Sequence, residues 1–275
     1  MNILPKSTLK FLIVATPVVT LLSSISPGFA GTLANAEAET FIYNFSQVPT
    51  SISTFTDTQT LAVAGKGTVL AEANANAYFD VNFCLKPDNC FPLANNSSQA
   101  ITLGEGKEYL GLAQSQAAAI GYQFKIAENQ EFAFDFYSVL NLETQKSLQQ
   151  ESIQAANYIA FYLFEDSSNN LLDFFSLNSS INSANKHNLS IQNSQGFQLS
   201  PLTTTNHEEN QASVNILLSG LYSRQFSQGQ NLTLITYQTS STKVKVPEPS
   251  TALSLLIFGV LGTVLGLKKR PSLSD

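Results

Sequence analysis

Tryptophan is absent from this chain of 275 residues, and cysteine, histidine and charged residues are scarce. Two cysteines can form one disulfide at most, which excludes a small disulfide-rich scaffold. The two histidines, His187 and His207, lie in no metal-binding or catalytic-triad motif, so we expect both to be solvated loop residues. The sequence also lacks Gly-x-Ser-x-Gly, His-Glu-x-x-His and a phosphate-binding glycine loop. It therefore indicates no enzyme class, and no cofactor is expected.

Charge is low and unevenly distributed along the chain. Nine of the 14 Lys and Arg residues and 18 of the 20 Asp and Glu residues lie between Gly31 and Val246, which gives this body a formal charge near −9. Its cations are scattered, so nucleic acid is excluded as a partner. About a third of the residues are Ser, Thr, Asn or Gln, yet 43% are apolar, so the chain has the composition of a folded protein. An acidic surface rich in hydroxyls and amides favours an extracellular matrix setting.

The first thirty residues have the pattern of a secretory signal peptide. Lys6 and Lys10 precede an uncharged apolar stretch, and small residues lead up to Ala30. We therefore predict a signal peptide at residues 1–30, cleaved between Ala30 and Gly31 by signal peptidase after passage through the secretion translocon. A second acceptable cut lies six residues later, and an uncleaved N-terminal anchor is the alternative.

The C-terminal residues predict a membrane-spanning helix. The uncharged residues 252–267 would rise roughly 25 Å as a helix, slightly less than an average hydrocarbon core. The cations that follow belong on the cytoplasmic side, so everything from Gly31 to Val246 is expected to be exported. A buried core helix is the alternative, although a terminal cation cluster needs water. The cluster comprises Lys268, Lys269 and Arg270.

A short proline-containing motif lies immediately before this helix. It consists of Val246, Pro247, Glu248, Pro249, Ser250 and Thr251. Motif, helix and basic cluster together (residues 246–270) resemble the PEP-CTERM sorting signal of exosortase substrates, which are exported proteins of bacteria that make extracellular polysaccharide. The resemblance implies that exosortase, a membrane-embedded cysteine transpeptidase, cuts near the Pro-Glu-Pro and passes the protein to the cell surface or matrix. The two prolines disfavour helix and keep the motif extended, while Ser250 or Thr251 can cap the membrane helix. An unprocessed juxtamembrane linker is the alternative.

Alternating hydrophobicity dominates the body. Apolar residues occupy every odd position from Val69 to Phe83, with polar residues at most even positions, which predicts a long strand with its odd face buried. Similar patterns predict the further strands 41–45, 112–126, 132–136, 153–163, 171–177, 189–197, 214–218 and 232–237. We expect an all-β domain over residues 31–238, an antiparallel β-sandwich or jelly roll. A short helix competes only at 143–154.

Polar segments predict the connections between these strands. Residues 166–170 are expected to form a hairpin loop. Residues 178–188 and 200–210 are expected to be long loops. The Ser/Thr-rich residues 239–245 are predicted to be a linker that lifts the domain off the membrane.

The two cysteines, Cys84 and Cys90, enclose a short loop directly after the long alternating strand. Thiols outside the cytoplasm oxidise, so we predict a disulfide that stabilises the fold by roughly 2 kcal/mol. Metal binding is the alternative, but two thiols without a third ligand nearby do not make up a zinc site.

A few carboxylates and tyrosines are candidates for binding. Glu165 and Asp166 could offer oxygen ligands to calcium, although a hairpin turn uses the same residue types without an ion. Asp135 is expected to face solvent, and a secreted hydrolase would need it to converge with Glu165 or Asp166. Three tyrosines, Tyr78, Tyr158 and Tyr162, lie opposite the apolar strand faces, where exposed rings can stack on sugars.

The pattern as a whole predicts a non-enzymatic, exosortase-processed surface or matrix protein with a structural or adhesive role, linked to extracellular polysaccharide. Two alternatives stay open: a lectin-like carbohydrate-binding module delivered in the same way, and an unprocessed single-span surface protein.

Overall fold

The computed structural model describes residues 31–86, 89–147, 150–184, 186–208 and 210–246. The predicted signal peptide, the motif from Pro247 to Thr251, the helix 252–267 and the basic cluster Lys268–Arg270 lie outside these residues. No helix in the described segments is long and apolar enough to cross a membrane. The described elements are β1 (Thr32–Tyr43), β2 (Ser51–Lys86), β3 (Asn89–Ile126), β4 (Gln130–Gln145), β5 (Ser152–Glu165), β6 (Asn170–Asn182), β7 (His187–Asn193), β8 (Phe197–His207), β9 (Gln211–Phe226) and β10 (Gln230–Val246).

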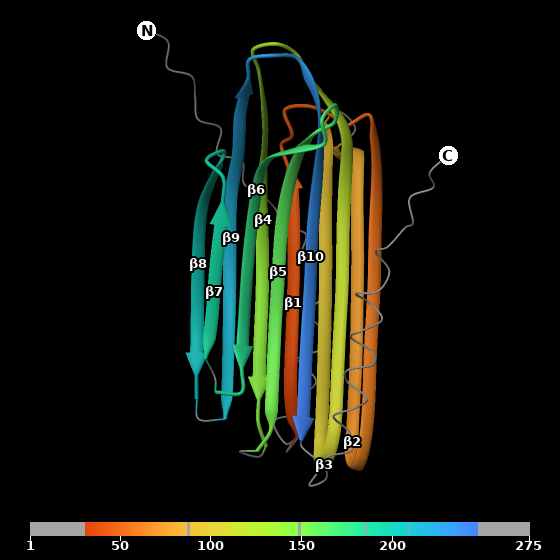
Figure 1. Cartoon of the computed structure of the whole chain (residues 1–275), viewed down its shortest axis with the longest axis vertical. Helices are drawn as coiled ribbons and strands as arrows, with labels where there is room; N and C mark the ends of the chain where they lie inside the picture. Colours follow the sequence, from red (N-terminus) through yellow and green to blue (C-terminus); the bar gives the residue numbers. More distant parts are fainter. Residues whose placement is uncertain (1–30, 87–88, 148–149, 185, 209, 247–275) are drawn as a thin grey trace, which may run out of the picture. The chain divides into compact units, whose positions relative to one another are not determined.

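All pairs of described strands are antiparallel, which confirms the predicted all-β, antiparallel architecture, and a doubled-over hairpin organises them. β3 pairs with β1 through residues 94–104 and with β10 through residues 109–126, while β2 follows β3 along its whole length. The hairpin bends between these halves, where Gly106 has a φ of +94° that favours glycine. Each of the two strands therefore contributes to two layers (Figure 1).

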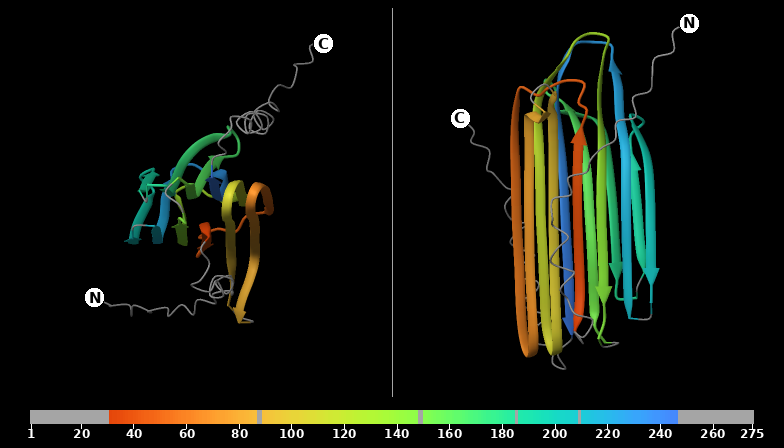
Figure 2. Two further views of the ribbon diagram at one scale, coloured as in Figure 1. Left: turned by 90° about the horizontal axis from the view of Figure 1, so that it is seen from below. Right: turned by 180° about the vertical axis from the view of Figure 1, so that it is seen from behind.

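The two layers face each other in a sandwich-like arrangement, visible from below in Figure 2. The β1 layer has the order β2 (second half, residues 67–86), β3, β1, β4, β9, β8. The β10 layer has the order β2 (first half, residues 51–64), β3, β10, β5, β6, β7. Each layer buries the side chains that point towards the other.

One part of the interior is aromatic. Phe134 stacks on Tyr222 with ring centroids 5.1 Å apart, and Phe136 meets Phe161 edge to face at 4.9 Å. Phe132, Phe175 and Phe197 join the same cluster. Full burial of each such side chain contributes roughly 1.5–3 kcal/mol, so this cluster is the main apolar core.

Another part of the interior is built from alanine and small polar residues. Ser98 and Ser240 meet across the layers with their Oγ atoms 2.7 Å apart. The Nδ2 of Asn96 donates to the Oγ1 of Thr236 at 2.8 Å, and the amide of Gln238 donates to the carbonyl of Ala38 at 2.6 Å. Small side chains allow this close approach, and these hydrogen bonds satisfy polar groups that water cannot reach.

The long alternating strand is confirmed. In the second half of β2, Phe79 is buried and the odd residues from Val69 to Ala77 are half-buried, whereas the even residues from Leu70 to Tyr78 are exposed. The predicted hairpin loop at 166–170 is also confirmed, because a turn over residues 166–169 joins β5 to β6.

The predicted linker at residues 239–245 is wrong. These residues belong to β10, which pairs with β3 on one side and β5 on the other. Ser240, Thr242 and Val244 point inward and are buried. Hydroxyl side chains serve as interior residues here, so the Ser/Thr composition that suggested a linker belongs to a central strand.

The predicted long loops and the competing helix are also wrong. Residues 178–188 contain the end of β6 and the start of β7, and residues 200–210 contain most of β8. Both β7 and β8 are edge strands with mostly exposed side chains. The predicted strand 189–197 is divided between them by the connection at 194–196. Residues 143–154 belong to the end of β4, the start of β5 and their connection rather than to a helix.

Candidate binding face

Aromatic side chains gather on the outer surface of the β10 layer, over the adjacent strands β3, β10 and β5. We call this set the aromatic face: Tyr122 on β3, Tyr237 on β10, and Tyr158, Tyr162 and Phe164 on β5. Strand alternation puts them outside, because their neighbours Ile159, Phe161 and Leu163 point into the core. Pairing between β10 and β5 then places Ile235 opposite Tyr162 and Tyr237 opposite Ala160.

Tyr158 and Tyr162 lie along the sheet surface. Four residues of strand separate their Cα atoms by about 13 Å, yet their Oη atoms are only 2.9 Å apart. Each ring must therefore lean along the strand towards the other. Ala160 between them is fully buried although it is on the outer face. The two rings thus form a platform over Ala160, and the ring of Tyr237 adjoins it with its centroid 6.2 Å from that of Tyr158.

Two phenols of the aromatic face, those of Tyr158 and Tyr237, carry no charge at physiological pH. Burial, followed by the hydrogen bond to Tyr162, raises the pKa of Tyr158 to about 12. Burial also raises the pKa of Tyr237. A neutral aromatic surface with hydroxyl groups suits an uncharged, hydroxyl-rich ligand.

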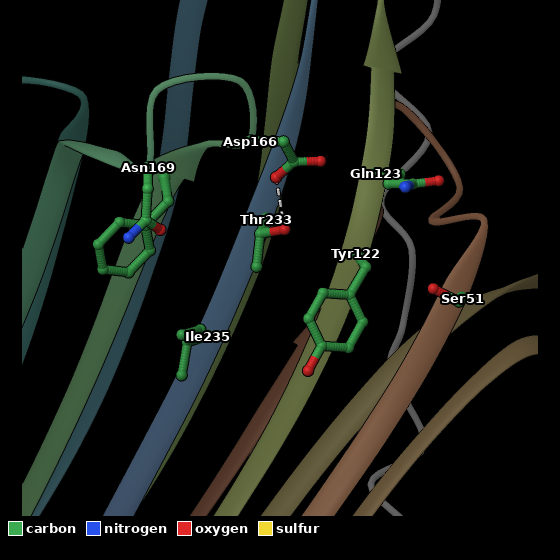
Figure 3. Close-up of a pocket in the computed structure, with 8 residues that line it drawn as sticks. Ser51, Tyr122, Gln123, Asp166, Asn169, Thr233 and Ile235 are labelled. Atoms are coloured by element: carbon green, nitrogen blue, oxygen red, sulfur yellow. Dashed lines mark hydrogen bonds between the residues drawn. The ribbon is translucent and has the colours of Figure 1, made fainter. Parts of the chain in front are cut away.

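A groove of about 680 Å³ opens next to the platform (Figure 3). Thr233 and Ile235 of β10 lie between Tyr122 of β3 and Phe164 of β5. Polar groups complete its lining: Ser51, Gln123, Asp166 and Asn169. The Oγ1 of Thr233 donates to the Oδ1 of Asp166 at 2.6 Å, which holds that carboxylate at one end of the groove.

Groove and platform form one continuous surface, since Ile235 of the groove pairs with Tyr162 of the platform. From Thr233 to Thr239 the surface follows β10 for about 20 Å. Its centre is aromatic and its rim presents hydroxyl, amide and carboxylate groups. This arrangement can stack on the C–H faces of a linear ligand and hydrogen-bond to its edges.

Of the three predicted tyrosines, the structure brings together only Tyr158 and Tyr162. Tyr78 lies on the second half of β2, on the outer surface of the β1 layer, where its hydroxyl donates to Asp80 at 2.7 Å. Tyr122, Phe164 and Tyr237 were not predicted. The apolar alternation of each strand could have placed these side chains on an outer face. Only the order and register of the strands show that they belong to the same face.

The predicted carboxylates do not converge. Asp135 is half-buried on β4 in the β1 layer and accepts a hydrogen bond from the Nδ2 of Asn44 at 2.6 Å. Glu165 and Asp166 lie at the end of β5 in the β10 layer, where Ser168 donates to Glu165. Among the residues that the structure describes, no group of three or more His, Cys, Asp or Glu could hold a metal ion.

The register of β2 and β3 pairs Cys84 directly with Cys90. Directly paired residues of antiparallel strands have Cα atoms about 4.5–5.5 Å apart, within the range of a disulfide. Their side chains lie outside the described set, so the disulfide stays a prediction. The histidines are not in loops: His187 begins β7, with its Nε2 3.0 Å from the Oγ of Ser179, and His207 ends β8.

No family model, curated protein or solved structure matches this chain. The aromatic face and the two terminal segments are therefore the features from which a function can be argued.

Proposed function

We propose that this is an exported, non-enzymatic cell-surface or matrix protein that exosortase processes at the motif 246–251. The signal-peptide pattern and the C-terminal motif, apolar segment and cations support this delivery. One structural observation carries the proposal further: β10 ends at Val246, the first residue of the motif. The folded body thus occupies the whole exported segment up to the motif, and only residues from Pro247 onward are left for the processing enzyme.

The mass of the surface-exposed form tests this proposal. Processing predicts a mature protein without residues from about Ser250 onward, and the variant Glu248→Ala is expected to retain them. A surface form that still carries Lys268 would exclude processing and leave a single-span anchored protein.

A second proposal concerns what the body does there: it binds extracellular polysaccharide on the aromatic face. The platform of Tyr158 and Tyr162 beside the groove favours this function, because neutral rings can stack on sugars while the rim hydrogen-bonds to them. The body that presents the face is, in this proposal, a β-sandwich with the ligand on one outer surface.

Affinity electrophoresis in polysaccharide extracted from the producing cells tests the binding. Tyr158→Ala and Tyr162→Ala are each expected to weaken retardation about 2- to 12-fold, which corresponds to roughly 0.5–1.5 kcal/mol per ring contact. Tyr137→Ala is the matched control, since Tyr137 is a half-buried tyrosine on the outer surface of the other layer, on β4. Equal retardation of all three variants and the original chain would exclude the aromatic face as the binding surface.

A further inference from the structure

The two layers are offset by one strand. A Cβ atom added at Gly111 of β3 would lie 2.8 Å from Val69, and one at Gly121 would lie 3.0 Å from Phe79. The second half of β2 in the β1 layer therefore faces β3 of the β10 layer. The first half of β3 faces β10 in turn, as the contact of Ser98 with Ser240 shows. Among the described residues, the β1 layer provides no strand to face the first half of β2.

This first half of β2, residues 51–64, therefore forms a ledge. Its inward-pointing residues Thr54, Thr56, Thr58 and Thr60 are all exposed, although their counterparts on β3 are buried. Its outward face exposes Phe55, Leu61 and Val63, with Phe55 53% exposed. One edge pairs with β3, and the other pairs with no described strand.

The ledge also lacks the usual protection of an edge strand. Asp57 is its single charged residue, and it contains no proline. Its pairing with β3 shows register irregularities only beyond Asp80, outside the ledge. Edge strands normally carry charges, prolines or bulges that block pairing with another chain. The edges at the opposite end have such features: β7 is seven residues long and β8 contains Pro201.

We propose that the ledge is the interface between two copies of this chain, related by a two-fold axis parallel to the strands. The axis places the ledge of each copy next to the second half of β2 in the other copy. There it faces the ledge of that copy and extends its β1 layer by one strand. The two halves of β2 run in opposite directions, so each ledge meets the second half of β2 of the second copy antiparallel. The arrangement is isologous and closed, and it removes the free β2 edges in both layers.

The positions of residues along the strand axis, compared between the two halves of β2, predict which residues of the two copies meet. Ala62 pairs with Gly111, and Val69 lies against Gly111 from the other layer, so Ala62 and Val69 are at the same height along the strands. In the same way Ile52 pairs with Gly121, against which Phe79 lies, so Ile52 and Phe79 are at the same height. The two-fold axis preserves these heights, so Leu61 lies beside Leu70 of the second copy.

The same heights match the remaining side chains. Phe55 comes within diagonal reach of Tyr78 of the second copy, and Asp57 lies opposite Asn74 of that copy, with Glu72 and Asn76 on its two diagonals. Leu70 and Tyr78 are 47% and 41% exposed in the single chain. The dimer thus pairs exposed apolar residues with each other and places an amide, that of Asn74, directly opposite the carboxylate of Asp57.

The threonine rows complete the match. Each threonine of one ledge faces the same threonine of the other, Thr58 opposite Thr58. Small hydroxyl side chains already pack this way between the two layers of one chain, where Ser98 meets Ser240. The interior between the two ledges is therefore packed with small hydroxyl side chains, as is part of the interior of the single chain.

Disulfide trapping in the full chain tests this geometry. The double variant Leu61→Cys/Leu70→Cys is expected to give a covalent dimer on a non-reducing gel, whereas each single variant is not. Within one chain these two positions lie on the outer surfaces of different layers, so a link between them joins two copies. Leu61→Cys/Leu221→Cys is the control, because Leu221 is exposed on β9 far from β2 in the strand order. Absence of the dimer, or equal trapping in the control, would overturn the proposal.

A second measurement needs no cysteine. Sedimentation of the full chain in mild detergent is expected to give the mass of a dimer at micromolar concentration. Thr58→Lys is expected to give the monomer, since it places two cations face to face, while the control Thr203→Lys on the exposed edge strand β8 stays dimeric. A monomeric original chain, or assemblies that grow beyond two copies, would contradict a closed dimer. Neither assay depends on polysaccharide binding or on C-terminal processing.

Discussion

Replacing Tyr222 with phenylalanine tests how a hydrogen bond to a buried carboxylate joins the two layers. Tyr222 of β9 and Asp173 of β6 are both buried, and the tyrosine hydroxyl donates to the Oδ2 of Asp173 at 2.8 Å. Arg224 donates to the same oxygen at 2.7 Å, but its side chain is 40% exposed, so solvent screens part of that interaction. A hydrogen bond to a charged acceptor contributes roughly 1.5–3 kcal/mol. Phenylalanine keeps the ring contacts to Phe134 and Phe197, so Tyr222→Phe is expected to lose about that amount.

Urea unfolding followed by tyrosine fluorescence measures this loss, because the chain has no tryptophan. The same substitution in an Asp173→Asn background removes a hydrogen bond between neutral groups and is expected to cost only about 0.5–1.5 kcal/mol. Equal costs in the two backgrounds, or a cost below about 0.5 kcal/mol in the original chain, would refute the role assigned to the charged acceptor.

Three further predictions concern the pH response, the platform and the packing between the layers. Burial raises the pKa of Glu37, so its stabilising contribution is present at low pH and is lost as pH rises through the folded-state pKa. Glu37→Gln is therefore expected to unfold at higher urea concentration than the original chain at pH 8, and the two midpoints are expected to converge towards pH 4; a constant difference would contradict this. In an ultraviolet titration, Tyr162→Phe is expected to lower the pKa of Tyr158 from about 12, because its hydrogen bond to Tyr162 is lost; an unchanged titration curve would count against that bond. Gly111→Val is expected to destabilise the fold by about 1–3 kcal/mol through collision with Val69, while Gly65→Ala, whose added Cβ comes no closer than 3.3 Å to Glu108, serves as the control in the same unfolding assay.

Apolar alternation was a reliable guide wherever one strand face meets an apolar interior. The pattern from Val69 to Phe83 predicts the second half of β2, and Ile159, Phe161 and Leu163 predict the inward face of β5. The same alternation puts Tyr158 and Tyr162 outside. The sequence could not predict that Tyr122 and Tyr237 lie on the same surface as these two tyrosines, because this depends on which strands are neighbours in the sheet.

Prediction failed where the interior is polar or where a strand is an edge. Residues 239–245 look like a linker, yet Ser240 and Thr242 are interior residues whose partners on β3 lie more than 100 positions earlier in the chain. The edge strands β7 and β8 expose most of their side chains, so the sequence pattern predicted one strand at 189–197 where the structure has parts of two. The ledge was equally hidden, since the offset between layers appears only when both are assembled.

The central place of β10 sets the order of events during folding. This strand is the last of the ten described strands, yet it lies between β3 and β5 in the middle of its layer. Until residues 230–246 have been synthesised, no strand joins β3 to β5. The β10 layer therefore stays open while the rest of the body emerges from the ribosome, and the last strand to appear is the one that closes it.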